Sequence, residues 1–339
     1  MRTIRIAASL AVLLFVSCAS APSAYAGKER AVRPAEHAVQ WNNDWARGAV
    51  FYEVFVRSFY DSNGDGKGDL QGLIAKLDYL QSLHVDALWL MPVFQSPSYH
   101  GYDTTDYETI ASDYGTKADF QQLLAEAHRR NIRVIVDYVM NHTSNEHPWF
   151  VMSASGPSSP KRDWYIWSDT DPGWRQPWQN GDVAWHLLPP NGPFYYGVFW
   201  SGMPDLNYRN PEVKAEMFRI AREWLTDGVD GFRLDATRYL IEDGPGPGQA
   251  DTPETHQLLK DFSANVASTK RDAVLVAENT VDTPTLATYY ADVPMNFNFP
   301  LAGAIVDGVK SWNAIGILQT LRAVIAAYPA GAIDAPFLT

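Results

Sequence analysis

The chain alternates between two patterns of hydrophobic and polar positions, short apolar runs and longer segments with helical periodicity. The apolar runs predict strands at residues 50–57, 87–91, 132–139, 229–235, 273–278 and 292–297. The periodic segments predict helices at residues 70–83, 117–130, 211–226, 253–269 and 312–328. Repeated strand-then-helix order indicates an α/β fold with a parallel sheet covered by helices.

Residues 143–208 interrupt this alternation. They show little helical periodicity and are rich in Pro, Gly, Ser and Trp. A structureless loop of that length is uncommon inside a compact domain. We therefore expect a small inserted domain between the third strand and the helix that follows it.

The predicted strand 229–235 carries two charges among apolar residues, Arg233 and Asp235. Strand residues two apart point to the same face, so these side chains are expected to lie side by side. A buried charge is costly unless it is paired. A guanidinium beside a carboxylate keeps the carboxylate ionised, which a nucleophile requires. A purely structural ion pair at the strand end explains this segment equally well.

The strand 273–278 is apolar and ends on Glu278. Desolvation at such a position raises a carboxyl pKa, as a general acid requires, although the side chain could also emerge into solvent. Asp235 and Glu278 end consecutive strands, and neighbouring strands lie about 4.8 Å apart. Their carboxyl groups are therefore expected about 5–5.5 Å apart, the separation found in retaining glycosidases. An ionised Asp235 and a protonated Glu278 would form a nucleophile and acid couple.

Polar residues also follow the strand 132–139. His142 could donate a hydrogen bond to a ligand hydroxyl, or it could cap or pack the inserted segment. Upstream, the segment 61–69 reads Asp-Ser-Asn-Gly-Asp-Gly-Lys-Gly-Asp. Alternating oxygen-bearing residues and glycines allow a tight loop around a hard cation such as Ca²⁺. Gly72 occupies the twelfth position, so the loop is no complete EF-hand, and an ion-free surface turn is the alternative.

Composition narrows the function. The 339 residues are 46% hydrophobic, enough for a large core, and the formal net charge is -12. This acidity argues against a surface for nucleic acids or anionic membranes.

The N-terminus predicts export. Residues 1–26 combine a basic start, an apolar run and an Ala-x-Ala cleavage site, the features of a signal peptide. The apolar run is too short for a transmembrane span. We expect a secreted or periplasmic protein, with 27–46 as a lead-in. A membrane-anchored lipoprotein carrying a lipid at Cys18 is the alternative.

Taken together, the segments resemble the alpha-amylase family, glycoside hydrolase family 13. The resemblance covers residues 47–339 and rests on an ordered series: FYEVFVRSF at 51–59, LWLMP at 88–92, GYDTTDY at 101–107, DYVMNH at 137–142, MPDLN at 203–207, GFRLDA at 231–236 and VAEN at 276–279. It implies a (β/α)8 TIM barrel formed by residues 47–142 and 209–339, with 143–208 as the inserted domain.

The resemblance also implies roles for individual residues. Asp235 matches the nucleophile, Glu278 the acid/base and Arg233 the arginine that orients the nucleophile. Four further residues match sugar-site positions of the family: His142 and Tyr102 at the cleavage point, with Tyr102 stacking on the ring, Asp103 as a sugar-binding carboxylate, and Asp137 as a structural carboxylate near the arginine.

The loop 61–69 resembles the calcium loop of the oligo-1,6-glucosidase branch. The implied ligands are Asp61, Asn63, Asp65, Asp69 and the carbonyl of Lys67. The segment MPDLN lies between the QPDLN of that branch and the MPKLN of the neopullulanase branch. The implied function is a retaining hydrolase of α-1,4-glucans or malto-oligosaccharides, with mixed specificity.

The chain departs from the family pattern near its end. The motif that carries the family's third catalytic carboxylate often begins Phe-Leu-Thr, and residues 337–339 have that sequence. We therefore expect a fragment that lacks this carboxylate, the eighth strand and the C-terminal β domain. The alternative is a non-catalytic amylase-like protein that binds sugar or a partner.

Overall fold

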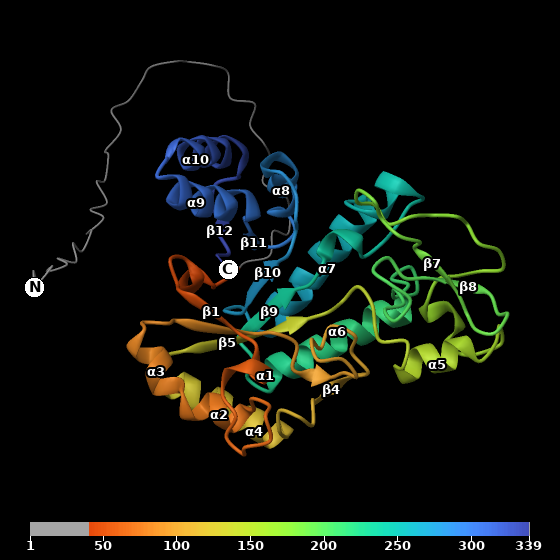
Figure 1. The fold of residues 1–339 in the computed structure, drawn as a ribbon, viewed down its shortest axis with the longest axis horizontal. Coiled ribbons are helices and arrows are strands. Elements are labelled where there is room, and N and C mark those ends of the chain that lie inside the picture. Colours follow the sequence, from red (N-terminus) through yellow and green to blue (C-terminus); the bar gives the residue numbers. More distant parts are fainter. Residues whose placement is uncertain (1–40, 339) are drawn as a thin grey trace, which may run out of the picture. The chain divides into compact units, whose positions relative to one another are not determined.

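A seven-stranded parallel sheet forms the centre of the computed structural model, which describes residues 41–338 (Figure 1). Strands that are neighbours in the sheet follow one another in this order: β1 (Phe51–Val54), β2 (Ala87–Leu90), β5 (Arg133–Tyr138), β9 (Gly231–Leu234), β10 (Val274–Ala277), β11 (Met295–Phe297) and β12 (Ile333–Ala335). The parallel α/β architecture predicted from the sequence is confirmed. Within the described residues the sheet is an incomplete barrel, because it contains seven strands rather than eight.

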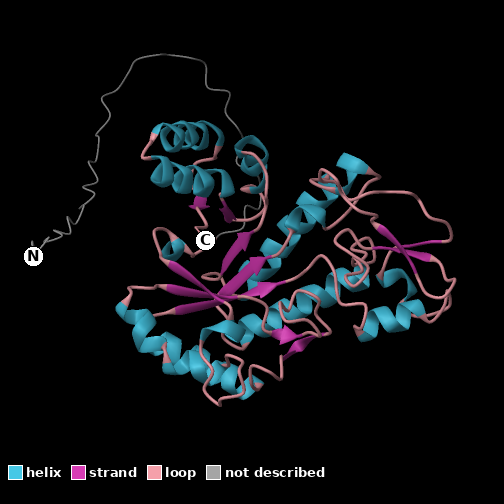
Figure 2. Ribbon diagram, viewed as in Figure 1, coloured by secondary structure: helices cyan, strands magenta, loops and turns pink. Residues whose placement is uncertain are grey.

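Helices follow the strands, and most of them cover the sheet (Figure 2). They are α2 (Leu70–Ala75), α3 (Leu77–Ser82), α4 (Lys117–Arg129), α6 (Pro211–Thr226), α7 (Pro253–Thr269), α8 (Thr283–Tyr289), α9 (Phe299–Ser311) and α10 (Ile315–Ala327). The last helix, α10, packs instead on α9 and α8. The bounds of α6 and α7 match the prediction because both starts carry strong signals. Asn210 and Thr252 cap these helices with their side chains, and a proline follows each cap.

The strands predicted at 229–235 and 292–297 are shorter in the structure, Gly231–Leu234 and Met295–Phe297, and three other elements differ more clearly. The strand predicted at 50–57 ends at Val54, and Val56–Phe59 form the short helix α1. The helix predicted at 70–83 is divided at Lys76 into α2 and α3. The helix predicted from residue 312 begins at Ile315, because Trp312 has a left-handed φ of 54° and ends α9.

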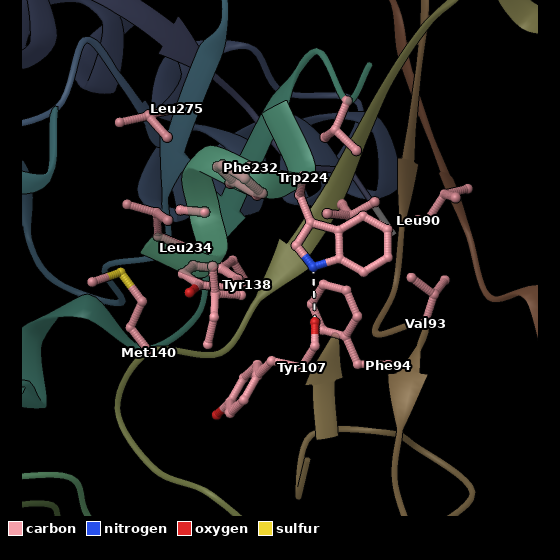
Figure 3. Close-up of a cluster of buried hydrophobic side chains, with 14 of the residues drawn as sticks. Leu90, Val93, Phe94, Tyr107, Tyr138, Met140, Trp224, Phe232, Leu234 and Leu275 are labelled. Carbon is pink, nitrogen blue, oxygen red and sulfur yellow. Dashed lines mark hydrogen bonds between the residues drawn. The ribbon is translucent and has the colours of Figure 1, made fainter. Parts of the chain in front are cut away.

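The two faces of the sheet carry different side chains. One set, including Leu90, Phe232 and Leu234, joins the large core beneath the helices, where the indole N–H of Trp224 in α6 donates to the carbonyl of Tyr107 at 2.8 Å (Figure 3). The alternate residues form a smaller apolar cluster: Trp89, Ile135, Val274, Val276, Met295, Phe297 and Ile333. The period of two along each strand therefore decides which residues face the inside of the sheet.

Residues 143–208 carry α5 (Pro148–Ala154) and a three-stranded antiparallel sheet. Its strands are ordered β6 (Trp167–Ser168), β8 (Phe194–Tyr196) and β7 (Trp185–Leu187). His142 and Asp205 form an antiparallel bridge, so the two ends of this segment meet. Nearby, β3 (Phe94–Gln95) pairs with β4 (Asp106–Ile110).

The predicted signal peptide and Cys18 lie outside the described residues. Within residues 41–338, no helix is both long enough and apolar enough to span a membrane. A cavity of about 650 Å³ lies between the first and last strands of the sheet, lined by residues of β1 and β12 and by Trp89, Phe297 and Phe337.

Candidate active site

Arg233 stands at the centre of a buried cluster of charges. It lies on β9 between Phe232 and Leu234, which face the helices, so its side chain points to the inner face of the sheet. Its Nη1 atom lies 2.7 Å from Oδ1 of Asp235, and the side chain is 5% exposed. The ion pair predicted between these two residues is present in the structure.

The same guanidinium binds Asp137, which lies on the neighbouring strand β5. Nη1 donates to Oδ1 at 2.7 Å and to Oδ2 at 2.9 Å. The contact follows from strand register, because Asp137 is the partner of Arg233 in the β5–β9 pair. Asp137 has no exposed side-chain surface, so it can hold the arginine but is shielded from solvent.

Glu278 is the third carboxylate in the cluster. It directly follows β10, and its Oε2 atom lies 2.6 Å from Nη2 of Arg233 and accepts a hydrogen bond from the backbone N–H of Ala236 at 3.2 Å. Glu278 was predicted to lie in apolar surroundings, but its carboxylate also contacts a guanidinium. Ala277 of β10 is the register partner of Leu234 of β9. The residues that follow them, Glu278 and Asp235, therefore lie side by side and reach the same guanidinium.

The pKa of Glu278 is nevertheless raised. Burial is the largest cause, Arg233 opposes it, and the neighbouring Asp235 adds to it. Burial likewise raises the pKa of Asp137, against the opposing effect of Arg233. One guanidinium cannot neutralise three carboxylates, so the cluster favours holding a proton. Of the three side chains, Glu278 is the most exposed at 28%, against 11% for Asp235. Glu278 is therefore best placed to exchange a proton with a ligand.

Two aromatic side chains hold Asp137 from the other side. The hydroxyl of Tyr102 and the indole N–H of Trp89 donate to its Oδ2 atom at 3.2 and 3.3 Å. The guanidinium of Arg233 lies 5.1 Å from the ring centroid of Trp89 and 5.6 Å from that of Tyr102. Trp89 was not among the predicted site residues. Its signal was the alternation of β2, where Leu88 and Leu90 belong to the opposite face.

His142 is buried between the cluster and the inserted segment. Burial lowers its pKa to about 4, so the ring is neutral. Its Nε2 atom lies 3.2 Å from the carbonyl of Tyr102, which can only accept, so Nε2 carries the proton. The ring packs edge-on against Phe199 at 5.3 Å. These contacts tie the inserted segment to the sheet, and the predicted contact of His142 with a sugar stays a prediction.

Asp103 lies apart from the contacts of Arg233. Its Oδ1 atom accepts hydrogen bonds from the hydroxyls of Ser96, at 2.7 Å, and of Ser98. His100 lies 4.0 Å away. The side chain is buried and held in one orientation by these neighbours. Its predicted role as a sugar-binding carboxylate is a prediction that this geometry leaves open.

A pocket of about 250 Å³ opens directly beside Glu278. Seven residues line it: Trp178, Phe199, Ala236, Arg238, Tyr239, Glu278 and Thr280. Two of its aromatic walls come from the inserted segment and the third from the loop after β9. The many tryptophans of 143–208 stand out in the sequence, but none of them was predicted as a site residue.

The loop 61–69 lies at the start of α2 and presents oxygen atoms in a tight turn. Oδ1 of Asp61 accepts hydrogen bonds from the backbone N–H groups of Asn63, at 3.1 Å, and Gly64. Its Oδ2 atom accepts one from the N–H of Gly66 at 2.8 Å. These bonds lower the pKa of Asp61. Asp69 instead caps α2, accepting from Gly72 at 2.7 Å. Among residues 41–338, no group of three or more His, Cys, Asp or Glu side chains is arranged so that it could hold a metal ion.

Comparisons with known proteins show the family of the chain. A family model described as "Alpha amylase, catalytic domain" matches residues 53–327. The chain belongs to the alpha-amylase family. The resemblance inferred from the motifs is thereby confirmed.

Several members of the alpha-amylase family are close in sequence. The chain is 47% identical over 282 residues to alpha-amylase 3 of Dictyoglomus thermophilum, covering 83% of this chain and 53% of that protein. It is 47% identical over 300 residues to the trehalose synthase of Pimelobacter, covering 82% and 52% of the two chains. For the oligo-1,6-glucosidase of Parageobacillus thermoglucosidasius, the identity is 40% over 268 residues, with 73% and 47% covered.

Solved structures of the alpha-amylase family share the fold. The alpha-amylase from H. orenii superposes with a TM-score of 0.79 at 42% identity and covers 86% of this chain and 60% of its own. The chain spans about half the length of the curated relatives it matches.

Proposed function

We propose that this member of the alpha-amylase family acts as a retaining hydrolase of α-1,4-glucans or malto-oligosaccharides. The observation that carries the proposal is the arrangement around Arg233, where Asp235 and Glu278 end neighbouring parallel strands and contact one guanidinium. Relatives named alpha-amylase, oligo-1,6-glucosidase and glucan 1,6-alpha-glucosidase support the α-glucosidic substrate class.

Two displacements are expected in the reaction. Asp235, paired with Arg233, attacks the anomeric carbon while Glu278 protonates the leaving oxygen. Glu278 then removes a proton from water, which releases the sugar from Asp235 with retained configuration. A carboxyl group with a raised pKa and solvent access suits the first of these roles of Glu278.

The stereochemistry of the product tests this proposal. The purified protein is expected to release α-glucose first from α-glucosyl fluoride, observed by proton NMR before mutarotation, because the fluoride leaving group adds no second sugar to the spectrum. Initial release of β-glucose would overturn the retaining mechanism. If no sugar is released but maltose still binds in calorimetry, the non-catalytic sugar-binding alternative is supported instead.

The pH dependence should report the acid. A general acid is active only while protonated, so kcat/KM is expected to fall as pH rises through the raised pKa of Glu278. Glu278→Gln should lower kcat on maltose about 10²–10⁴-fold and abolish this alkaline decline. Steady-state kinetics across pH 4–9 would check both, and an unchanged alkaline decline in the variant would assign the acid to another group.

We also propose that the loop 61–69 binds Ca²⁺. Asp61, Asn63, Asp65, Asp69 and the Lys67 carbonyl supply only oxygen atoms, the ligands that Ca²⁺ prefers. Asn63 and Asp65 are exposed, and Asp61 already faces the interior of the turn through its bonds to Asn63, Gly64 and Gly66.

Removal of the metal provides the test. Calcium at about 100-fold above its dissociation constant should stabilise the protein by about 2.7 kcal/mol. Calorimetry in CaCl2 and in EGTA should therefore give different unfolding temperatures, and Asp61→Asn should reduce the difference. Identical temperatures in the two buffers would contradict a calcium site.

A further inference from the structure

The loop after β9 is held by a bidentate ion pair between Arg238 and Asp251, and neither residue has a role in the proposed catalytic steps. Arg238 donates from Nε to Oδ1 of Asp251 at 2.9 Å and from Nη2 to Oδ2 at 2.5 Å. Its Nη1 atom donates to the carbonyl of Thr280 at 3.0 Å. Arg238 thus joins the segment that follows Asp235 to the segment that follows Glu278.

The backbone conformation and the hydrogen bonds of Asp251 fix its position in this loop. Its φ is +55°, a left-handed conformation that is uncommon for non-glycine residues and that Asp tolerates better than most. Its backbone N–H donates to the carbonyl of Arg238 at 2.9 Å, and the hydroxyl of Tyr289 in α8 donates to its Oδ1 atom. Both carboxylate oxygens are therefore engaged in holding the loop.

The fastened loop forms one side of the pocket beside Glu278. Tyr239 follows Arg238 directly, and its ring meets Trp178 edge-on at 5.8 Å and Phe199 edge-on at 5.7 Å. Trp178 and Phe199 stack on each other at 5.9 Å. Three aromatic faces around about 250 Å³ offer room and apolar contact for one sugar ring, next to the carboxyl group that would protonate a leaving oxygen.

We propose that Arg238 and Asp251 are positioning residues that fix this pocket for the leaving-group sugar. The pair holds Tyr239 and Thr280 in place, and Arg238 also lines the pocket itself, so the pair determines recognition of a single sugar on the leaving side. This inference rests on the proposed hydrolase function.

Two substrates distinguish an effect on sugar binding in the pocket from an effect on the bond-breaking step. Maltose places a glucose in the pocket, whereas α-glucosyl fluoride releases a fluoride ion that leaves it empty. Asp251→Asn should lower kcat/KM on maltose about tenfold, mainly through KM, as expected for a lost hydrogen bond to a charged group. The loss on α-glucosyl fluoride should be at least about fivefold smaller, by the same arithmetic.

Two further variants complete the experiment. Arg238→Lys keeps the charge but loses the two-pronged contact, so it should show the same selective loss on maltose. Asp78→Asn breaks the Arg130–Asp78 pair at 2.7 Å on the helical surface and serves as the matched control. It should change the ratio of the two substrates by less than about twofold, because surface pairs contribute little.

Equal losses on both substrates, or no loss on either, would overturn the positioning role. If Asp251→Asn fails to fold, Arg238→Lys decides by the same ratio. If the wild-type protein hydrolyses neither substrate, the proposed function has failed. The role of the pocket is then tested by measuring the affinity for maltose in calorimetry. Equal maltose affinity in the wild type and in Arg238→Lys would overturn the inference.

Discussion

Asp235→Asn is expected to lower kcat on maltose by about 10⁴-fold or more, because an amide of the same shape cannot attack the anomeric carbon. The amide oxygen can still accept the hydrogen bond that Arg233 donates to Oδ1 at 2.7 Å. The variant also removes one of three carboxylates around a single guanidinium, so the fold should lose little stability. Activity and stability are therefore expected to separate in this variant.

Single-turnover and steady-state kinetics on maltose would measure the loss, with thermal unfolding as the check on the fold. Asp235→Ala guards against deamidation of the asparagine back to aspartate. Asp272, which pairs with Arg133 at 2.8 Å outside the cluster, offers a matched control as Asp272→Asn. A residual rate within tenfold of the wild type would show that another group is the nucleophile.

Arg233→Met should give the largest loss of stability. The substitution leaves Asp137, Asp235 and Glu278 without their shared cation, and removing one partner of a buried pair costs about 3–5 kcal/mol. The cost should be greatest at alkaline pH, where all three carboxylates are ionised in the variant. It should shrink at acidic pH, because protonation removes the uncompensated charges.

Urea unfolding at pH 5 and pH 8 would measure this difference in the free energy of unfolding. Arg233→Lys keeps one charge but cannot span three carboxylates, so its loss should be intermediate. A loss of the same size at both pH values would contradict the electrostatic cause and point to lost packing against Trp89 and Tyr102.

The sheet could be predicted because its signals are local. Each strand is a short apolar run, and the starts of α6 and α7 are marked by Asn210 and Thr252 followed by proline. The helix α9 was not predicted, because Pro300, Gly303 and Gly308 weaken its helical pattern. In β12, three residues are too few to show a period.

The contacts in the site could be predicted only where they follow from the alternation of side chains along a single strand. That rule placed Arg233 beside Asp235, and the consecutive order of β9 and β10 brought in Glu278. It could not reveal that Glu278 touches the same guanidinium, because this depends on the register between two strands. The aromatic pocket depends on still longer contacts, since Trp178 and Tyr239 meet only after the inserted segment has folded.

The bridge between His142 and Asp205 bears on how such enzymes diversify. Because these two residues pair, lengthening the segment between them would raise the entropic penalty of closing it only slowly, by about 0.6 kcal/mol for each doubling of its length. The segment supplies Trp178 and Phe199 to the pocket but none of the atoms that bind Arg233. Exchanging it could therefore alter which acceptor or leaving group is recognised while the bond-breaking residues stay untouched, a modular route to new specificities on one scaffold.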